Sequence, residues 1–216
     1  MKLFGSTLSP FVRKVAVYAV EKGLELPLEA AGLGRGSPEF MRASPFGKMP
    51  AFTDGDFAIS DSTAIITYLE AKYPEPPLIP ADPAARARTI WFEEFADTML
   101  IACGGKMFFN RFVSPTFLKR PGDLAAADAA QTNDWPPLLD YLEGVATGDY
   151  LVGDALTLAD IAVASAFATL SHIEVGADAA RHPNVAAWLG RILSRPSFAA
   201  VMERERAFVA QVREAA

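Results

Sequence analysis

The sequence predicts a small α/β domain joined to an all-helical domain. Over residues 1–75, short strand-like segments alternate with helical ones, whereas every apolar pattern beyond residue 84 has the period of a helix. Between the two, residues 73–84 hold five prolines in twelve residues, which cannot continue a helix and favour an extended linker. We therefore expect an α/β domain over residues 1–76, a linker over 77–84 and a helical domain over 85–216.

The first domain is predicted to have the order β-α-β-α-β-β-α. Its expected strands cover residues 2–5, 26–30, 51–53 and 57–59, the last two forming a hairpin. Its expected helices cover residues 10–22, 37–42 and 63–73. Pro27 confines the second strand to an early or edge position, because proline cannot donate to a sheet ladder.

The second domain is predicted to consist of helices alone. They are expected over residues 84–114, 122–146, 157–173 and 183–193 and after Arg195, with a break at Pro136 and Pro137. Thr157 and Asp160 match a capping box, with Asp where Glu is usual. We therefore expect Asp160 to support folding and not to act as a catalytic acid.

Composition limits what the protein can do. With 51% apolar and 21% charged residues, the 216-residue chain can bury a substantial core. Neither a membrane span nor a signal peptide is predicted, so we expect a cytoplasmic protein. The single cysteine, Cys103, excludes an internal disulfide, and two histidines beside it provide no zinc-ligand spacing. A net charge of −6 without a basic cluster argues against a nucleic acid partner.

Ser9 stands where the first helix begins, and two roles are open to its hydroxyl. It precedes Pro10, which suits the first helical position because its missing N–H costs nothing there, and an apolar pattern of helical period follows. These features predict a helix cap. A hydroxyl at the positive end of a helix can also stabilise an anion. The segment alone favours the cap.

Two further segments place polar groups at the starts of elements. In GKMP, a cis Met49–Pro50 bond would turn the backbone N–H and C=O of Met49 outward, where they can pair with an extended peptide. A plain strand-initiating proline is the alternative. In SDSTAI, one of residues 60–62 is expected to cap the helix that follows. A hydroxyl at that helix start and the carboxylate of Asp61 can also bind the two charged groups of an α-amino acid.

Taken in order, the SPFVRKV helix, GKMP, SDSTAI, the proline linker and LVGDALTLADIAVA resemble the cytosolic glutathione transferases over nearly the whole chain, in a serine-type, bacterial-like form. The resemblance implies a thioredoxin-like first domain that binds glutathione, with Pro50 in cis. It also implies an enzyme without a metal that conjugates glutathione to small hydrophobic electrophiles. A glutathione-dependent peroxidase or isomerase, or a non-catalytic binding or assembly protein, stays open as an alternative.

Residue by residue, the resemblance implies the contacts with glutathione. Met49 is expected to bind the cysteinyl backbone, and Asp61 with Ser62 the γ-glutamyl end. Lys48 and Arg35 are the candidates for the glycyl carboxylate.

The same resemblance gives Ser9 a catalytic role, because serine-type classes place there the hydroxyl that stabilises the glutathione thiolate. A free thiol with a pKa near about 8.5 is only slightly ionised at neutral pH, and a hydrogen-bond donor at a helix N-terminus lowers that pKa. We therefore expect Ser9 both to cap its helix and to activate the thiol, with Ser6 and Thr7 as rivals. Serine in place of cysteine at this position disfavours mixed-disulfide chemistry.

The helical domain is expected to supply the site for the electrophile. Gly104 and Gly105 lie inside a predicted helix, where each costs about 1 kcal/mol relative to Ala. Close helix packing and room for an apolar ligand both explain them. Cys103 is expected to be a buried side chain and not a nucleophile. The expected lining of the hydrophobic site is Phe11, Cys103, Met107, Phe108 and Phe112.

A second apolar pattern falls on the first helix of the helical domain. Trp91, Phe92, Phe95 and Leu100 recur at helical spacing, which is typical of a core or a subunit interface. The resemblance implies that this helix and the helix over residues 63–73 lie at the two-fold contact of a homodimer.

Overall fold

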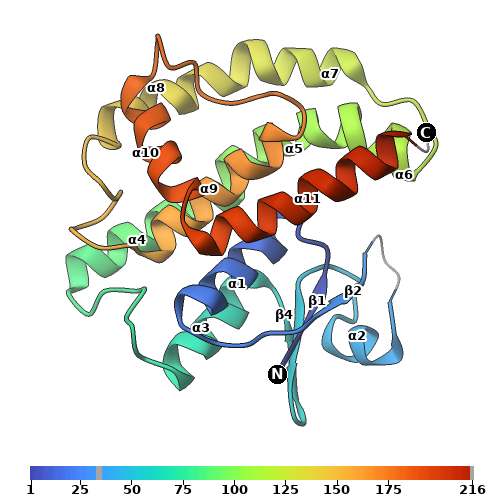
Figure 1. The fold of residues 1–216 in the computed structure, drawn as a ribbon, viewed down its shortest axis with the longest axis vertical. Coiled ribbons are helices and arrows are strands. Elements are labelled where there is room, and N and C mark those ends of the chain that lie inside the picture. Colours follow the sequence, from blue (N-terminus) through green and yellow to red (C-terminus); the bar gives the residue numbers. More distant parts are fainter. Residues whose placement is uncertain (33–35, 215–216) are drawn as a thin grey trace. The chain divides into compact units, whose positions relative to one another are not determined.

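The computed structural model describes residues 1–32 and 36–214 (Figure 1). The chain divides into two compact units, Met1–Ala81 and Asp82–Ala216. The first contains a four-stranded sheet with three helices, and the described residues of the second form helices without a strand. The predicted fold class is confirmed.

The elements of the first unit follow the predicted order. They are β1 (Lys2–Gly5), α1 (Pro10–Glu21), β2 (Leu28–Ala30), α2 (Pro38–Ala43), β3 (Ala51–Asp54), β4 (Phe57–Ser60) and α3 (Ser62–Lys72). Strand β2 begins later than expected, because Pro27 stays outside the strand and only its carbonyl accepts a hydrogen bond, from the N–H of Leu3 at 2.9 Å. The strand lies at an edge of the sheet, as the proline requires.

The sheet has the strand order β2-β1-β3-β4. Strand β1 is parallel to β2 and antiparallel to β3, and β3 and β4 form the expected hairpin. Phe4 pairs with Ala51 across β1 and β3, and both pack against Phe40 of α2. Figure 1 shows α2 on one side of the sheet and α1 with α3 on the other. This is the thioredoxin-like arrangement.

A buried ion pair fastens α1 to α3 and to the proline-rich segment. The side chain of Lys22 is fully buried, and its Nζ lies 2.5 Å from Oε2 of Glu70 on α3. The same Nζ donates to the carbonyls of Tyr73 at 2.7 Å and Pro76 at 2.8 Å. All three donors of the ammonium are therefore used, which offsets the cost of burying the charge. Glu70 also accepts from the hydroxyl of Tyr18.

The second unit begins with one long helical segment. It is built of α4 (Pro83–Phe95), the π-helical turn η1 (Ala96–Leu100), α5 (Ile101–Phe108), the π-helical turn η2 (Phe109–Val113) and α6 (Ser114–Phe117). The next segment contains α7 (Leu124–Ala129), the π-helical turn η3 (Ala130–Asp134) and α8 (Trp135–Val145). The unit ends with α9 (Leu158–Ser171), α10 (Pro183–Leu193) and α11 (Pro196–Glu214).

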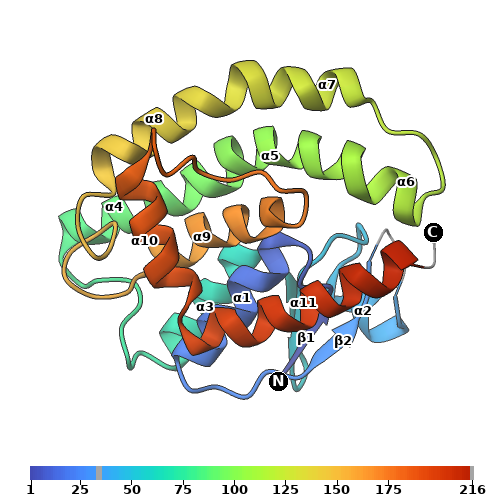
Figure 2. The ribbon, with the colours of Figure 1, turned by 45° about the horizontal axis from the view of Figure 1, so that its top comes forward.

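The break expected at Pro136 and Pro137 is absent. Helix α8 begins at Trp135, so both prolines fall in its first turn, where helical N–H groups have no intrahelical partner. The helical segment therefore continues from α7 through η3 into α8, which Figure 2 shows as one rod.

Helix α9 forms the centre of the second unit. Every residue from Leu158 to Leu170 is buried, and the helix contacts α4, α5 and α10 (Figure 2). A helix that is largely apolar and has no polar face is typical of such a central position. Of the helices that the structure describes, none has the length and apolar character that crossing a membrane requires.

Candidate active site

Ser9 lies at the end of the turn that joins β1 to α1, in the N-cap position. Its backbone is extended, with φ −73° and ψ 124°, and its carbonyl accepts from the N–H of Arg13 at 3.0 Å. The side chain makes no capping hydrogen bond, so the prediction of a side-chain cap is wrong. The Ser9 hydroxyl is partly exposed and has no hydrogen-bond partner among the described residues.

The rival hydroxyls lie on the same turn. Ser6 and Thr7 are partly buried, as Ser9 is, and the carbonyl of Ser6 accepts from the N–H of Ser9 at 2.9 Å. The turn begins directly after Gly5, whose φ of 146° is strained for any other residue. A Cβ on Gly5 would lie 2.5 Å from Val12 Cγ2 and 3.3 Å from Met49 Cβ. The start of the Ser6–Ser9 turn is therefore packed closely against Met49.

The Met49–Pro50 bond is cis, as the resemblance implied. Ser44, which the sequence did not single out, shapes the loop before it: its Oγ accepts from the N–H of Lys48 at 2.9 Å and donates to the Lys48 carbonyl at 2.7 Å. The loop turns at Gly47, where φ is 65°. The Lys48 side chain points outward and is exposed. A serine three residues before a glycine is a common turn signal, so this clamp has a sequence signature.

Asp61 and Ser62 begin α3 beside this loop. The N–H of Asp61 donates to the carbonyl of Pro50 at 3.3 Å, which connects the two predicted binding segments. Oδ1 of Asp61 accepts from the N–H of Ala64 at 3.0 Å, so the expected cap of α3 is confirmed. Asp61 is exposed and holds a φ of 87°, unusual for a residue other than glycine and typical of functional positions. Its second carboxylate oxygen has no partner among the described residues.

Arg35, the other candidate for the glycyl carboxylate, lies outside the described residues. The remaining predicted contacts, Met49, Pro50, Asp61 and Ser62, are brought together by the packing and hydrogen bonds above. Ser62 is 3% exposed and occupies the first position of α3. Its backbone N–H is one of the unpaired donors of a helix N-terminus, which favour an anionic group.

The residues expected to line the hydrophobic site lie on α1 and along α5 and η2. Phe11 is partly exposed on α1, whereas Met107, Phe108 and Phe112 are buried within the second unit. The rings of Phe108 and Phe112 are in contact, with centroids 5.2 Å apart. Cys103 is 5% exposed and its Sγ lies 3.5 Å from the carbonyl of Ala130.

Close packing accounts for Gly104. A Cβ there would lie 3.0 Å from Cδ1 of Leu170, so the glycine lets α5 approach α9. At Gly105 the nearest atom to an added Cβ is 3.9 Å away, and the helix is not crowded there. Burial raises the pKa of the neighbouring Cys103 thiol to about 11, which makes it a poor nucleophile at neutral pH.

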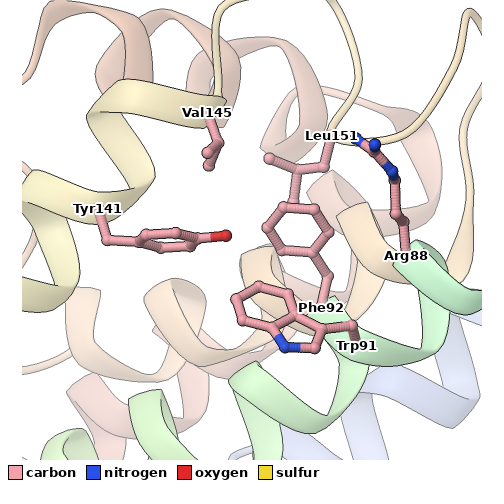
Figure 3. A pocket seen from close by; sticks show the side chains of 6 residues that line it. All are labelled: Arg88, Trp91, Phe92, Tyr141, Val145 and Leu151. Carbon is pink, nitrogen blue, oxygen red and sulfur yellow. The ribbon is translucent and has the colours of Figure 1, made fainter.

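A cavity of about 330 Å³ lies in the second unit, and none of the predicted site residues lines it (Figure 3). Its lining consists of Arg88, Trp91, Phe92, Tyr141, Val145 and Leu151. Trp91 stacks on Phe95 at 5.5 Å, and both rings contact Tyr141 of α8. Trp91 and Tyr141 are 47% and 41% exposed. Figure 3 shows the rings of Tyr141, Phe92 and Trp91 around the space, with Arg88 at its rim. Of the four residues with helical spacing, Phe92, Phe95 and Leu100 are core, and Trp91 faces outward.

Comparison with known families agrees with this arrangement. Residues 3–77 match the model described as "Glutathione S-transferase, N-terminal domain". Residues 107–196 match the model described as "Glutathione S-transferase, C-terminal domain". The two matches fall in the first and second units respectively.

Individual relatives cover almost the whole chain. Glutathione S-transferase 3 of Zea mays is 34% identical over 206 residues, which span 92% of this chain and 91% of the relative. A glutathione S-transferase structure from Rhodospirillum rubrum F11 superposes with a TM-score of 0.83 at 27% identity, covering 93% of this chain and 90% of that one. Another, from Methylobacterium radiotolerans and in complex with glutathione sulfonate, superposes with a TM-score of 0.75 at 29% identity, covering 93% of each chain. This chain therefore belongs to the glutathione S-transferase family and is a glutathione transferase.

Proposed function

We propose that the protein conjugates glutathione to hydrophobic electrophiles and that the Ser9 hydroxyl stabilises the reacting thiolate. The observation that carries this proposal is that the Ser9 hydroxyl, at the start of α1, forms no hydrogen bond with the described residues. Ser9 occupies the N-cap position, yet its side chain makes no capping bond. The hydroxyl is thus free to donate to a ligand.

The chemical need for such a donor follows from thiol ionisation. At neutral pH a thiol with a pKa near about 8.5 is mostly protonated, and only the thiolate is a good nucleophile. A donated hydrogen bond and the positive end of α1 both favour the anion, so they lower the pKa of the bound thiol. The thiolate then forms a C–S bond with the electrophile, the leaving group departs with its electron pair, and the thiol proton passes to solvent.

The same proposal assigns the binding contacts. The backbone of Met49 would pair with the cysteinyl part of glutathione, and the exposed Lys48 ammonium would reach the glycyl carboxylate. The free oxygen of Asp61 would hold the γ-glutamyl ammonium, and the N-terminal amides of α3 at Ser62 would hold the carboxylate. The relative solved with glutathione sulfonate shows that a protein similar to this one binds a tripeptide of that kind.

Within the second unit, the electrophile would lie against the apolar side chains of α5 and η2, Met107, Phe108 and Phe112. Cys103 contributes packing to this region, since its Sγ is directed at the Ala130 carbonyl. We also assign the protein to the cytoplasm, because the family it resembles is cytosolic and its one cysteine is free.

The decisive experiment is a pH titration of bound glutathione, followed by the ultraviolet absorbance of the thiolate. The titration in the wild-type protein should lie below that of free glutathione and should move upward in Ser9→Ala. Turnover should fall about 100-fold or more, as for the loss of one preorganised donor. Ser9→Thr keeps a hydroxyl and should retain much of the activity, whereas the charge of Ser9→Asp should abolish it.

Ser6→Ala and Thr7→Ala are the matched controls and should leave the titration unchanged. If Ser9→Ala titrates as the wild type does and either Ser6→Ala or Thr7→Ala does not, the activating hydroxyl is the one whose removal changes the titration. If none of the three changes the titration, hydroxyl activation is wrong.

We further propose that the protein is a homodimer formed through the outward face of α4. Trp91 and Tyr141 expose a contiguous aromatic surface next to the cavity, which is what a symmetric partner would cover. Sedimentation should show a species of twice 23.2 kDa at micromolar concentration. Trp91→Glu should shift it to the monomer, and a wild-type protein that sediments only at 23.2 kDa contradicts the proposal.

A further inference from the structure

A row of phenylalanine rings runs from the interior of the second unit to its surface. Phe108 contacts Phe112 at 5.2 Å, Phe112 contacts Phe117 at 5.7 Å, and Phe117 lies parallel to Phe208 of α11 at 6.3 Å. Phe108 and Phe112 are 8% and 3% exposed, whereas Phe117 and Phe208 are 37% and 42% exposed. The row therefore offers an apolar, aromatic surface at its outer end, continuous with two residues of the proposed electrophile site.

Arg213 places a positive charge beside this row. The carbon at the centre of its guanidinium lies 5.9 Å from the centroid of the Phe112 ring. Its NH2 group donates to the carbonyl of His172, at the C-terminus of α9, at 2.7 Å. A cation–π contact and a hydrogen bond thus fix the guanidinium from two sides.

Most of the N–H donors of the Arg213 guanidinium form no hydrogen bond with the described residues. A guanidinium carries five N–H donors, and the bond to His172 is the one that Arg213 makes among the described residues. Among the described residues no ion pair joins Arg213 to an acidic side chain, and Glu205 on the same helix is 2% exposed with its Oε2 held 3.0 Å from Nε2 of His172. A planar cation with free donors next to aromatic rings suits a planar anion.

We infer that the electrophile site takes flat aromatic substrates that carry a carboxylate, with the ring on Phe117 and Phe208 and the carboxylate on Arg213. This inference rests on the proposed conjugating function and adds its substrate class. Arg213 would be a specificity residue and would take no part in forming the C–S bond. The ring contacts supply affinity without regard to charge, and Arg213 supplies the preference for the anion.

A matched pair of electrophiles tests the inference, benzyl chloride and para-carboxybenzyl chloride. In both, the glutathione thiolate forms a C–S bond at the benzylic carbon, the C–Cl bond breaks, chloride leaves with the electron pair and the thiol proton goes to solvent. The second substrate differs by its carboxylate alone. Each rate is divided by the uncatalysed rate with glutathione, which removes the intrinsic reactivity of the two chlorides.

In Arg213→Met, KM for para-carboxybenzyl chloride should rise about tenfold, as expected for losing one charge-assisted interaction, while KM for benzyl chloride stays within about twofold. Arg213→Lys keeps the charge and should restore part of the difference. Phe208→Leu should raise KM for both substrates. Arg204→Met, at an exposed arginine on the same helix, is the matched control and should change neither.

An equal rise for both substrates in Arg213→Met would mean that Arg213 only holds α11 to α9, and this overturns the inference. No change for either substrate overturns it as well.

Direct binding separates this inference from the proposed function. Calorimetry with benzyl alcohol and para-(hydroxymethyl)benzoate, which do not react with glutathione, should show tighter binding of the carboxylate, lost in Arg213→Met. A protein that keeps this preference but does not conjugate glutathione contradicts the proposed function alone. Equal affinities for the two ligands contradict the inference alone.

Discussion

The helix starts at Ser9 and at Thr157 have similar sequence signatures, yet their polar groups are used in opposite ways. At α9, the carboxylate of Asp160 is fully buried and accepts four hydrogen bonds. Its partners are the N–H of Leu151 at 2.8 Å, the N–H and hydroxyl of Thr157 at 3.0 and 3.2 Å, and Nε1 of Trp188 at 3.0 Å. At α1, the Ser9 hydroxyl is partly exposed and accepts from no backbone N–H of its helix.

The difference shows how a structural helix start can be told from a functional one. Where every polar atom is buried and paired, as at Asp160, the group holds the fold together and has nothing left for a ligand. Where the side chain of an N-cap residue makes no capping hydrogen bond, as at Ser9, that side chain can bind or activate a ligand. Asp61 at α3 lies between the two, since one carboxylate oxygen caps the helix and the other has no partner among the residues that the structure describes.

The largest effect expected from this comparison is the loss of stability in Asp160→Asn. Oδ1 accepts from the N–H groups of Leu151 and Trp188, and Oδ2 from the N–H of Thr157, so an amide NH₂ in either position would face an N–H donor and at least one hydrogen bond would fail in a buried site. We expect a loss of about 3 kcal/mol or more in the free energy of unfolding, measured by chemical denaturation. Asp149→Asn, in a mostly exposed ion pair with Arg191, should cost less than about 1 kcal/mol. A similar cost in both variants would contradict the structural role of Asp160.

The next effect is on ligand affinity and concerns Asp61→Asn. Asparagine caps a helix as well as aspartate does, so stability should change little. The loss of the charge should weaken glutathione binding about tenfold, as for a charge-assisted hydrogen bond to an ammonium. Calorimetry with glutathione and a denaturation curve measure the two effects separately. Unchanged affinity would remove Asp61 from the binding site and leave it as a cap.

A smaller effect separates two serines that both precede a proline at a helix start. The Oγ of Ser37 accepts from the N–H of Phe40 at 3.2 Å and caps α2, whereas Ser9 makes no such bond. Ser37→Ala should therefore cost about 1 kcal/mol of stability, and Ser9→Ala less than about 0.5 kcal/mol. A loss of equal size in the two variants, in thermal or chemical unfolding, would show that Ser9 is a cap in solution.

These contrasts also show what the sequence can and cannot predict. Local signals predicted the order of elements in the first unit and a helix cap within residues 60–62, because each depends on residues a few positions apart. The unspent hydroxyl of Ser9 could not be predicted, since a proline-led helix start looks the same with or without the side-chain bond. The backbone of the two N-cap serines differs as well, with ψ 124° at Ser9 and 162° at Ser37.

Contacts between residues distant in the chain could not be predicted from the sequence either. The sequence left two explanations for Gly104, and only the position of Leu170 on another helix favours close packing. The burial of Lys22 against Glu70 had no local signal, because lysine is usually exposed. The row from Phe108 to Phe208 joins the helical segment α5–η2–α6 to α11, a pairing that no periodicity reveals.

The smallest expected effect is an absence of reaction at Cys103, a buried and partnered group like Asp160. Burial raises the pKa of its thiol to about 11, above its value of about 8.5 in an unfolded chain. The folded state therefore keeps the thiol neutral, and the stability linked to this group is lost as the pH rises from about 9 towards 11. With an aromatic disulfide reagent near about pH 8, the folded protein should react only as fast as it opens, and the denatured protein at once. Immediate stoichiometric labelling of the folded protein would show that Cys103 is an accessible thiolate. It would also show that burial does not make side chains unreactive in this fold.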